Sequence, residues 1–239
     1  MTASNKSTLI STFATLLSLV VIALPSSAQS YNAAGDFSAT SNPNGAWSYG
    51  YSFGVGSTFH LDTTNTALYA PGVPLSGWLG NENSVPFTGY PYVVHNGTAG
   101  PVSINVNTVY QPGQLGLHPG DSNEVSVVRW TAPFSGTFSI ATTFSGLSSV
   151  GDSADVHILH NGSSLFNSTV IGSPSPASYS APQSILAGDT IDFVVGNGGN
   201  GLNDDTTVLS ASIVPEPGTL GLVGMGLGCL LSFRFLKRK

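Results

Sequence analysis

The sequence predicts an all-β protein, an antiparallel β-sandwich or jelly roll flanked by an N-terminal signal peptide and a C-terminal transmembrane helix. Three observations favour this fold class. Apolar and polar residues alternate with the period of a strand between residues 29 and 213, turn residues separate the alternating runs, and no amphipathic helical pattern occurs there. Of the 239 residues, 41% are hydrophobic and 8% are charged, so the chain has enough apolar side chains for one packed core.

Residues 1–28 have the three parts of a secretory signal peptide. Lys6 gives a positive start, an apolar run covers residues 16–24, and small residues at 26–28 supply a cleavage site. The alternative is a buried N-terminal helix, which Pro25 and the small residues after it disfavour. The sequence therefore predicts that the mature chain is exported.

The exported part, residues 29–213, is predicted to be a single β-domain. In the run 136–144, Phe138, Ile140 and Phe144 fall on one face and mostly polar residues on the other, as in a half-buried strand. Asn161-Gly162 suits a type I′ turn and predicts a hairpin. Strands are expected at residues 47–53, 92–95, 102–109, 124–130, 136–144, 155–160, 163–169, 189–195 and 206–214.

This number of short strands, with no repeat of fixed period, favours a sandwich or jelly roll over a solenoid or propeller. Residues 54–90 contain several proline and glycine turn signals and few clean alternations. That segment is expected to be a long elaborated loop.

The C-terminal residues 214–239 have three parts in order. Pro215-Glu216-Pro217 comes first, then an uncharged apolar run at 218–233, then a basic end. Sixteen helical residues span about 24 Å, less than the ~30 Å of a bilayer core, so thinning of the bilayer and snorkelling basic side chains would cover the mismatch. The basic residues, which should stay cytoplasmic, are Arg234, Lys237, Arg238 and Lys239.

This tail resembles the PEP-CTERM sorting signal, which combines a Pro-Glu-Pro motif, a short hydrophobic helix and a basic terminus. The resemblance implies that an exosortase, a membrane transpeptidase-like protease, recognises Pro215, Glu216 and Pro217 in a Gram-negative bacterium that makes exopolysaccharide. The alternative is a plain C-terminal membrane anchor. Export, an inner-membrane precursor and delivery to the cell surface or extracellular matrix follow from the resemblance.

The charges exclude one class of partner. The net charge of the chain is −6, and between residues 29 and 214 Arg129 is the only Lys or Arg against eleven acidic residues. Proteins that bind nucleic acid need a basic surface that displaces counterions from phosphates. Nucleic acid is therefore not an expected partner.

A second resemblance concerns the body of the chain. Residues 42–51, 117–120, 127–133 and 188–193 look like segments of bacterial secreted β-sandwich modules, which accompany PEP-CTERM tails and resemble carbohydrate-binding jelly rolls. The resemblance implies a β-sandwich with a link to carbohydrate, but it carries over no binding residues.

The most specific ligand-binding hypothesis is that exposed aromatic rings bind a sugar, because sugar rings stack on aromatic rings while polar groups bind the sugar hydroxyls. Trp47, Tyr49 and Tyr51 alternate and share one strand face. The alternative is that these rings belong to the core, as aromatic residues mostly do. The candidates are Trp47, Tyr49, Tyr51, Trp78, Tyr90 and Tyr92.

Arg129 is a further candidate for ligand binding. Its planar fork could clamp an acidic sugar or a carboxylate ligand. The structural alternative is an ion pair with one of the eleven acids, with the guanidinium packed on an aromatic ring.

Acidic residues near turns suggest a structural calcium site, because Ca²⁺ takes six to eight oxygen ligands. No calcium-loop motif is present, and aspartates also cap turns in β proteins. No other cofactor is expected. The candidate ligands are Asp152, Asp155, Asp204 and Asp205.

Catalysis has little support in the sequence. Glu82 and Glu124 could serve as the acid and base of a glycosidase, but nothing around them singles them out. His157 and His160 are three residues apart, which on a strand places them on opposite faces and disfavours a shared metal. The sequence therefore predicts a non-catalytic, structural or adhesive protein with exopolysaccharide as a candidate ligand; the alternative is a jelly-roll polysaccharide lyase or glycosidase.

Overall fold

The computed structural model describes residues 29–66, 72–80, 91–120, 123–150, 153–201 and 203–217. They consist of strands, turns and irregular segments, which confirms the all-β prediction for this part of the chain. None of them belongs to a helix with the length and hydropathy to cross a membrane. The predicted signal peptide at 1–28, the predicted membrane helix at 218–233 and the basic tail lie outside the described residues.

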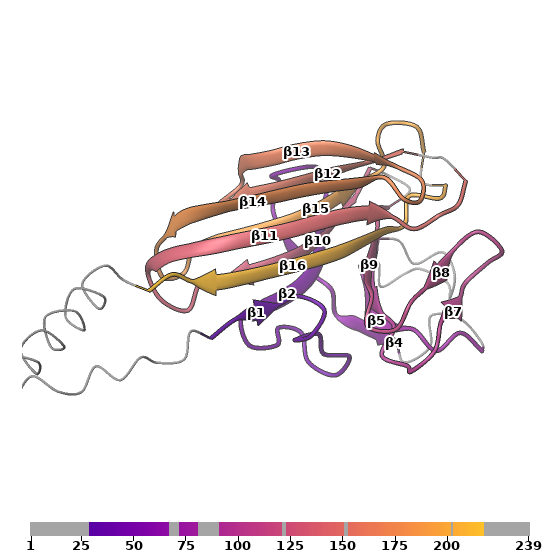
Figure 1. The fold of residues 1–239 in the computed structure, drawn as a ribbon, viewed down its shortest axis with the longest axis horizontal. Coiled ribbons are helices and arrows are strands. Elements are labelled where there is room, and N and C mark those ends of the chain that lie inside the picture. Colours follow the sequence, from indigo (N-terminus) through magenta and orange to yellow (C-terminus); the bar gives the residue numbers. More distant parts are fainter. Residues whose placement is uncertain are drawn as a thin grey trace, which may run out of the picture. The chain divides into compact units, whose positions relative to one another are not determined.

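Short strands come first in the described part of the chain, and the long strands follow from β10 onward (Figure 1). Their bounds are β1 Tyr31–Asn32, β2 Trp47–Ser52, β3 His60–Leu61, β4 Thr64–Thr66, β5 Ser76–Leu79, β6 Tyr92–His95, β7 Val102–Ser103, β8 Val109–Tyr110, β9 Leu115–His118, β10 Val125–Thr131, β11 Gly136–Gly146, β12 Ser153–His160, β13 Ser163–Ile171, β14 Pro176–Ile185, β15 Thr190–Gly196 and β16 Thr207–Pro215.

The strands form two main sheets and one small hairpin. The first sheet has the order β14-β11-β16-β9-β6-β5-β4, with β1 beside β16, and the second has the order β13-β12-β15-β10-β2-β3. The pairs β11–β14, β11–β16, β10–β15 and β12–β15 are antiparallel. Strands β7 and β8 make a separate two-stranded ladder. The architecture is an antiparallel β-sandwich, as predicted.

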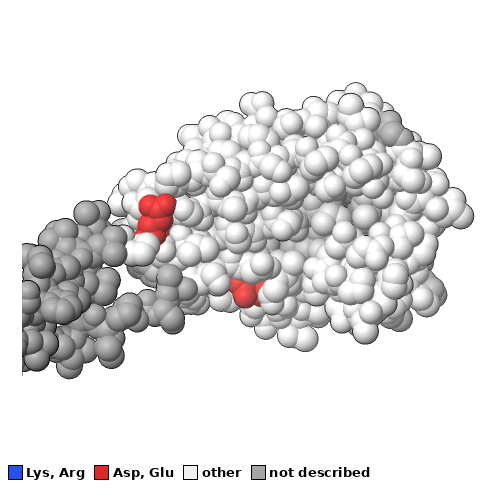
Figure 2. All heavy atoms as spheres, viewed as in Figure 1, with Lys and Arg blue, Asp and Glu red and all other residues white. Residues whose placement is uncertain are grey.

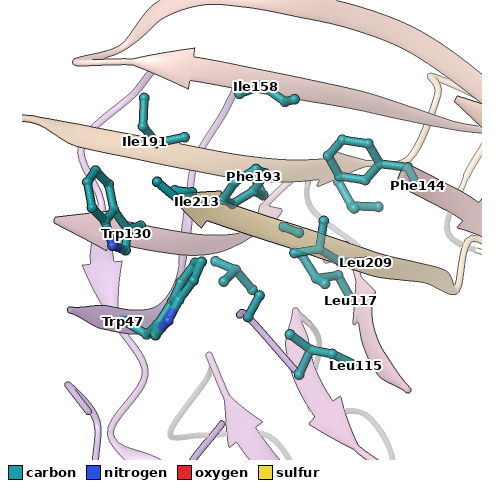
Figure 3. Close-up of a cluster of buried hydrophobic side chains, with 14 of the residues drawn as sticks. Trp47, Leu115, Leu117, Trp130, Phe144, Ile158, Ile191, Phe193, Leu209 and Ile213 are labelled. Carbon is teal, nitrogen blue, oxygen red and sulfur yellow. The ribbon is translucent and has the colours of Figure 1, made fainter. Parts of the chain in front are cut away.

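The core lies between the two main sheets. Side chains from both sheets form one buried cluster, in which Trp130, Phe193 and Ile158 come from the second sheet and Phe144 and Ile213 from the first (Figure 3). Burying one such side chain stabilises the fold by about 1.5–3 kcal/mol. The alternation along β11 produces this packing, because its apolar residues point inward.

The predicted hairpin is present between β12 and β13. Asn161 and Gly162 have φ angles of 50° and 78°, the left-handed conformation that a type I′ turn requires. The ladder between the two strands runs from Ser153↔Ile171 to His160↔Ser163. A local sequence signal was sufficient here because the turn itself dictates the pairing.

Two sequence-based expectations about the strands were wrong. Residues 54–90 are not one long loop, because β3, β4 and β5 lie within them. Residues 102–109 are not one strand: β7 and β8 pair with each other, and the chain turns between them. Neither β9 nor β14 was expected, and β14 contains Pro176 and Pro182, which a strand tolerates at the edge of a sheet.

Both ends of the sandwich chain meet at one end of β16. Tyr31 in β1 is opposite Ile213, and β16 continues to Pro215. One compact unit covers Ser30–Glu216, so the strand ladder extends past residue 213, where the sequence placed the domain boundary. The loop that precedes β16, residues 203–206, lies at the opposite end of this nine-residue strand, about 30 Å away.

Candidate functional site

A cavity of about 440 Å³ lies beside that loop. It is formed by the turn between β7 and β8, the end of β9 and the residues before β16. Its volume falls in the range of about 300–1,000 Å³ that is usual for small-molecule sites. Polar side chains supply most of its wall: Asn105, Asn107, Thr108, His118, Asn203 and Asp204.

The β7–β8 turn positions two asparagines at the cavity. The Asn105 side-chain oxygen accepts a hydrogen bond from the Asn107 backbone N–H at 2.8 Å, which folds the turn back on itself. The Asn107 carbonyl accepts from the Ser149 N–H at 2.9 Å and fixes the turn to the β11–β12 connection. Val106, between the two asparagines, is 94% exposed. The amides are therefore held at the surface by backbone contacts.

His118 forms the inner wall of the cavity as a neutral imidazole. The residue is 4% exposed, and its Nδ1 donates a hydrogen bond to the Pro119 carbonyl at 2.9 Å. Its ring lies 5.1 Å from that of Tyr92. Burial lowers the pKa of His118 to about 4, although the Pro119 carbonyl and the charge of Asp204 act in the opposite direction. At neutral pH the ring therefore brings no positive charge to the cavity.

Asp204 is the acidic member of the wall. Its backbone is in the left-handed region, with φ 64°, and its Oδ1 accepts from the Ser148 hydroxyl at 2.8 Å. The neighbouring Asp205 is 2% exposed. Asp204 and Asp205, two of the four calcium candidates, are thus adjacent in the chain, but Asp204 is half-buried and Asp205 is buried.

The other calcium candidates are placed elsewhere. Asp155 lies on β12 and accepts from the His157 ring at 2.7 Å and from the Gly198 N–H at 2.7 Å, and Asp152 lies outside the described residues. The His157 hydrogen bond is the main reason why the pKa of Asp155 is lowered. In the described ranges, no three His, Cys, Asp or Glu residues are grouped as ligands of a metal ion. A calcium site remains a sequence-based prediction.

The proposed aromatic platform is largely inside the protein. Trp47, Tyr49 and Tyr92 are each at most 1% exposed and Trp78 is 6% exposed, so the expectation that they present rings to solvent was wrong. Trp47 and Tyr49 point into the sandwich because the inner face of β2 is covered by the first sheet. Tyr92 still borders the cavity, whereas Tyr90 lies outside the described residues.

Tyr51 is the described candidate that reaches the surface. Its ring stacks on His60 with centroids 5.2 Å apart, and Phe53 packs edge-on against it at 5.6 Å. Phe53 is 63% exposed. The sequence did not single out Phe53, which directly follows β2, or His60, which the β2–β3 pairing brings beside Tyr51. The three rings form a partly exposed aromatic cluster.

Arg129 is engaged within the protein. Its Nε and Nη2 donate to the two carboxylate oxygens of Asp192 at 2.7 and 2.8 Å, and its guanidinium lies 4.2 Å from the centre of the Phe59 ring. Arg129 and Asp192 are directly opposite on β10 and β15. The structure therefore has the ion pair that the sequence analysis gave as the alternative to a ligand clamp.

The remaining titratable candidates do not converge on a catalytic centre. His157 contacts Asp155, while His160 contacts Asp189 at 3.0 Å. A hydrogen bond from Asn161, together with the Leu186 N–H and His160, lowers the pKa of Asp189 to about 2. His157 and His160 thus contact two different carboxylates. Glu82 lies outside the described residues.

Asp62 is a buried carboxyl group that the sequence did not single out. It is 2% exposed, and neither carboxylate oxygen has a hydrogen-bond partner among the residues that the structure describes. Burial raises its pKa well above the ordinary value. The folded state therefore binds a proton more tightly than the unfolded state, so stability falls as pH rises from about 4 toward the folded pKa.

We expect Asp62→Asn to stabilise the protein at neutral pH by about 1–2 kcal/mol, because the variant removes the cost of burying an unpaired carboxylate. At pH 3.5 the gain should be smaller, since Asp62 is then protonated in both states. Urea denaturation at both pH values measures the difference. Equal gains or equal losses at the two pH values would show that the carboxyl group is not the cause.

Comparison with known proteins gives three findings, of which the first is that no curated protein sequence matches the chain. The second is that solved structures of carbohydrate-binding modules are similar to it. CBM51 from Clostridium perfringens GH95, solved with methyl-galactose, is 16% identical over 53% of this chain and 90% of that chain, with a TM-score of 0.37. CBM35 from Cellvibrio japonicus Abf62 is 14% identical over 52% and 93%, with a TM-score of 0.29.

The third finding concerns the end of the last strand and the residues after it. Residues 214–239 match the model of the PEP-CTERM protein-sorting motif. The match begins at Val214, inside β16, and includes Pro215-Glu216-Pro217. Such a motif indicates an exported protein that an exosortase processes. This chain therefore carries a PEP-CTERM protein-sorting motif at residues 214–239.

Proposed function

We propose that this is a non-catalytic protein of the cell surface or extracellular matrix, sorted by an exosortase, whose β-sandwich binds a neutral glycan of the exopolysaccharide. The observation that carries the glycan proposal is the cavity beside His118, with its wall of amide and hydroxyl groups. The sorting part rests on the motif at residues 214–239. The role is structural or adhesive.

The chemistry of the cavity wall supports a sugar ligand. Each asparagine amide offers two donors and an acceptor, and each threonine hydroxyl can donate or accept, so the wall can match the alternating donors and acceptors of a sugar. Asn203 is exposed, and Asn107 is half-buried and held by Ser149. The part of the wall around Asn107, which is fixed in this way, loses little conformational entropy on binding.

The electrostatics support a neutral rather than an acidic ligand. Among the described lining residues there is no Lys or Arg, Asp204 is acidic, and His118 is neutral. Arg129, whose fork could have bound a carboxylate, is already held by Asp192. Figure 2 shows no Lys or Arg on the described part of the face that it draws.

The described lining residues also do not include the pair of acids on which most glycosidases depend. Of the lining residues that the structure describes, Asp204 is the only carboxylate, and Ser148 donates to it. Glycosidases generally use two carboxyl groups placed on either side of the scissile bond. This favours a binding module over the alternative, a polysaccharide lyase or glycosidase.

The position of the cavity suits a protein attached through its C-terminal end. The cavity lies next to residues 203–206, before β16, and the sorting motif begins at the other end of that strand. A strand of this length separates the two by about 30 Å. Attachment at the motif would thus leave the cavity open to polymers.

A glycan array probed with residues 29–217 tests the proposal. We expect saturable binding to one or more neutral glycans, and no shortened product when the bound glycan is incubated with the protein and analysed by mass spectrometry. Absence of binding to any neutral glycan would contradict the ligand proposal. Formation of shortened or unsaturated products would instead establish the enzymatic alternative.

A further inference from the structure

The first two residues of the Pro-Glu-Pro motif are part of the folded sandwich. Pro215 lies opposite Phe138 in the β11–β16 ladder. The Glu216 backbone N–H donates to the Thr137 carbonyl at 2.8 Å. The Ser139 hydroxyl donates to the Glu216 side-chain oxygen Oε1 at 2.7 Å. Both the backbone and the carboxylate of Glu216 therefore have partners on β11.

These contacts occupy the backbone N–H and the carboxylate of Glu216, the groups by which a protease would recognise the motif. Proteins that bind extended peptides pair with the backbone of the peptide and take its side chains into pockets. Glu216 carries the only charge in Pro-Glu-Pro and, because proline has no N–H, the only backbone donor. That donor and the carboxylate both face β11.

We propose that Ser139 and the start of β11 hold the sorting motif on the sandwich, and that exosortase processing requires the release of Glu216 from them. Ser139 is then a positioning residue for the sorting reaction: it acts through Glu216. The inference rests on the sorting part of the proposed function and is independent of glycan binding.

The release involves a local opening rather than unfolding of the domain. Glu216 is exposed, and Pro215 is half-buried, so detaching them leaves the buried Phe138 and Ile213 in the core. Strand ends with few buried contacts open at low free energy. The Ser139–Glu216 hydrogen bond sets how often the motif is free, and so how long the precursor keeps its membrane tail.

Pulse-chase labelling of the full chain in a host with an exosortase tests this inference. We expect Ser139→Ala to lose its tail about 2–5-fold faster than the wild type, as the loss of one hydrogen bond predicts. Ser139→Thr keeps the hydroxyl and should restore the wild-type rate. Ser180→Ala, an exposed serine of β14, is the matched control and should have no effect.

A rate of tail loss in Ser139→Ala that is equal to or slower than that of the wild type would overturn the proposal that Ser139 holds the motif. Amide hydrogen exchange on the purified full chain provides a second test that needs no exosortase: the Glu216 amide should be protected in the wild type and less protected in Ser139→Ala. An unprotected Glu216 amide in the wild type would also overturn the proposal. Failure of the sorting assignment is distinguishable, because replacing Pro215-Glu216-Pro217 with alanines would then leave processing unchanged.

Discussion

Replacing Arg129 with methionine is expected to lower the free energy of unfolding by about 3 kcal/mol, the low end of the usual cost of removing one partner of a buried ion pair, because the Arg129 side chain is 24% exposed. The Asp192 side chain is only 6% exposed and accepts two hydrogen bonds from Arg129. Methionine keeps the apolar contact with Phe59 but leaves the carboxylate buried and unpaired. Urea denaturation monitored by tryptophan fluorescence measures the change.

A double variant separates the cost of the unpaired charge from the loss of the arginine itself. In Arg129→Met with Asp192→Leu neither charge of this pair remains, and we expect most of the lost stability to return, because apolar pairs often replace buried ion pairs at little cost. If the free energy of unfolding of Arg129→Met alone lies within about 1 kcal/mol of that of the wild type, the ion pair does not contribute much to the stability of the second sheet.

Acidification from pH 7 to pH 4 is expected to remove about 3 kcal/mol of stability through His118 alone, at about 1.4 kcal/mol per unit of pKa difference. Burial lowers the folded pKa of His118 from 6.5 to about 4. Between these values the unfolded state binds a proton and the folded state does not. The stability is therefore complete above pH 6.5 and is lost as pH falls toward 4.

His118→Asn is the variant that isolates this effect. Its side-chain amide can replace Nδ1 as the donor to the Pro119 carbonyl, but it does not titrate. From pH 7 to pH 4 we expect the wild type to lose about 3 kcal/mol of stability relative to the variant. Asp62 changes stability in the opposite direction with pH, but it is present in both proteins and cancels in the difference. A difference that does not change with pH would contradict the buried, neutral His118.

Local patterns predicted the parts of this fold that depend on neighbouring residues. The alternation of Phe138, Ile140 and Phe144 and the turn at Asn161-Gly162 are properties of short segments, and the structure contains both. The pattern of β14 was hidden by its two prolines: Pro176 is the first residue of the strand, and Pro182 is tolerated because the strand lies at the edge of the sheet. Whether a strand lies at an edge depends on the whole sheet, so the sequence could not reveal it.

Long-range pairing decided the outcome for most of the candidate site residues. Alternation placed Trp47 and Tyr49 on one face of a strand, but only the packing of the two sheets determines that this face is the buried one. Arg129 meets an acid 63 positions away, on a strand that neighbours its own. The sequence indicated an acid as the partner of Arg129 but gave no means of choosing it among the eleven.

The cavity could not be predicted for a similar reason. Its wall combines the β7–β8 turn, His118 and the loop at 203–206, which are far apart in the chain. Asp204 was a candidate calcium ligand, whereas Asn105, Asn107 and Asn203 lie in segments whose composition is that of ordinary turns. Clusters of asparagine in turns of a β-protein are a signal that could have directed attention to this end of the sandwich.

Calorimetric titration of the glycan selected by the array tests directly whether the cavity beside His118 is the glycan site. For Asn107→Ala combined with Asn203→Ala we expect an affinity at least about 10-fold weaker than that of the wild type, from the loss of two side-chain hydrogen bonds at about 1 kcal/mol each. Asn167→Ala, an exposed asparagine on β13, should bind like the wild type. Undiminished binding by the double variant would show that the glycan binds elsewhere on the protein.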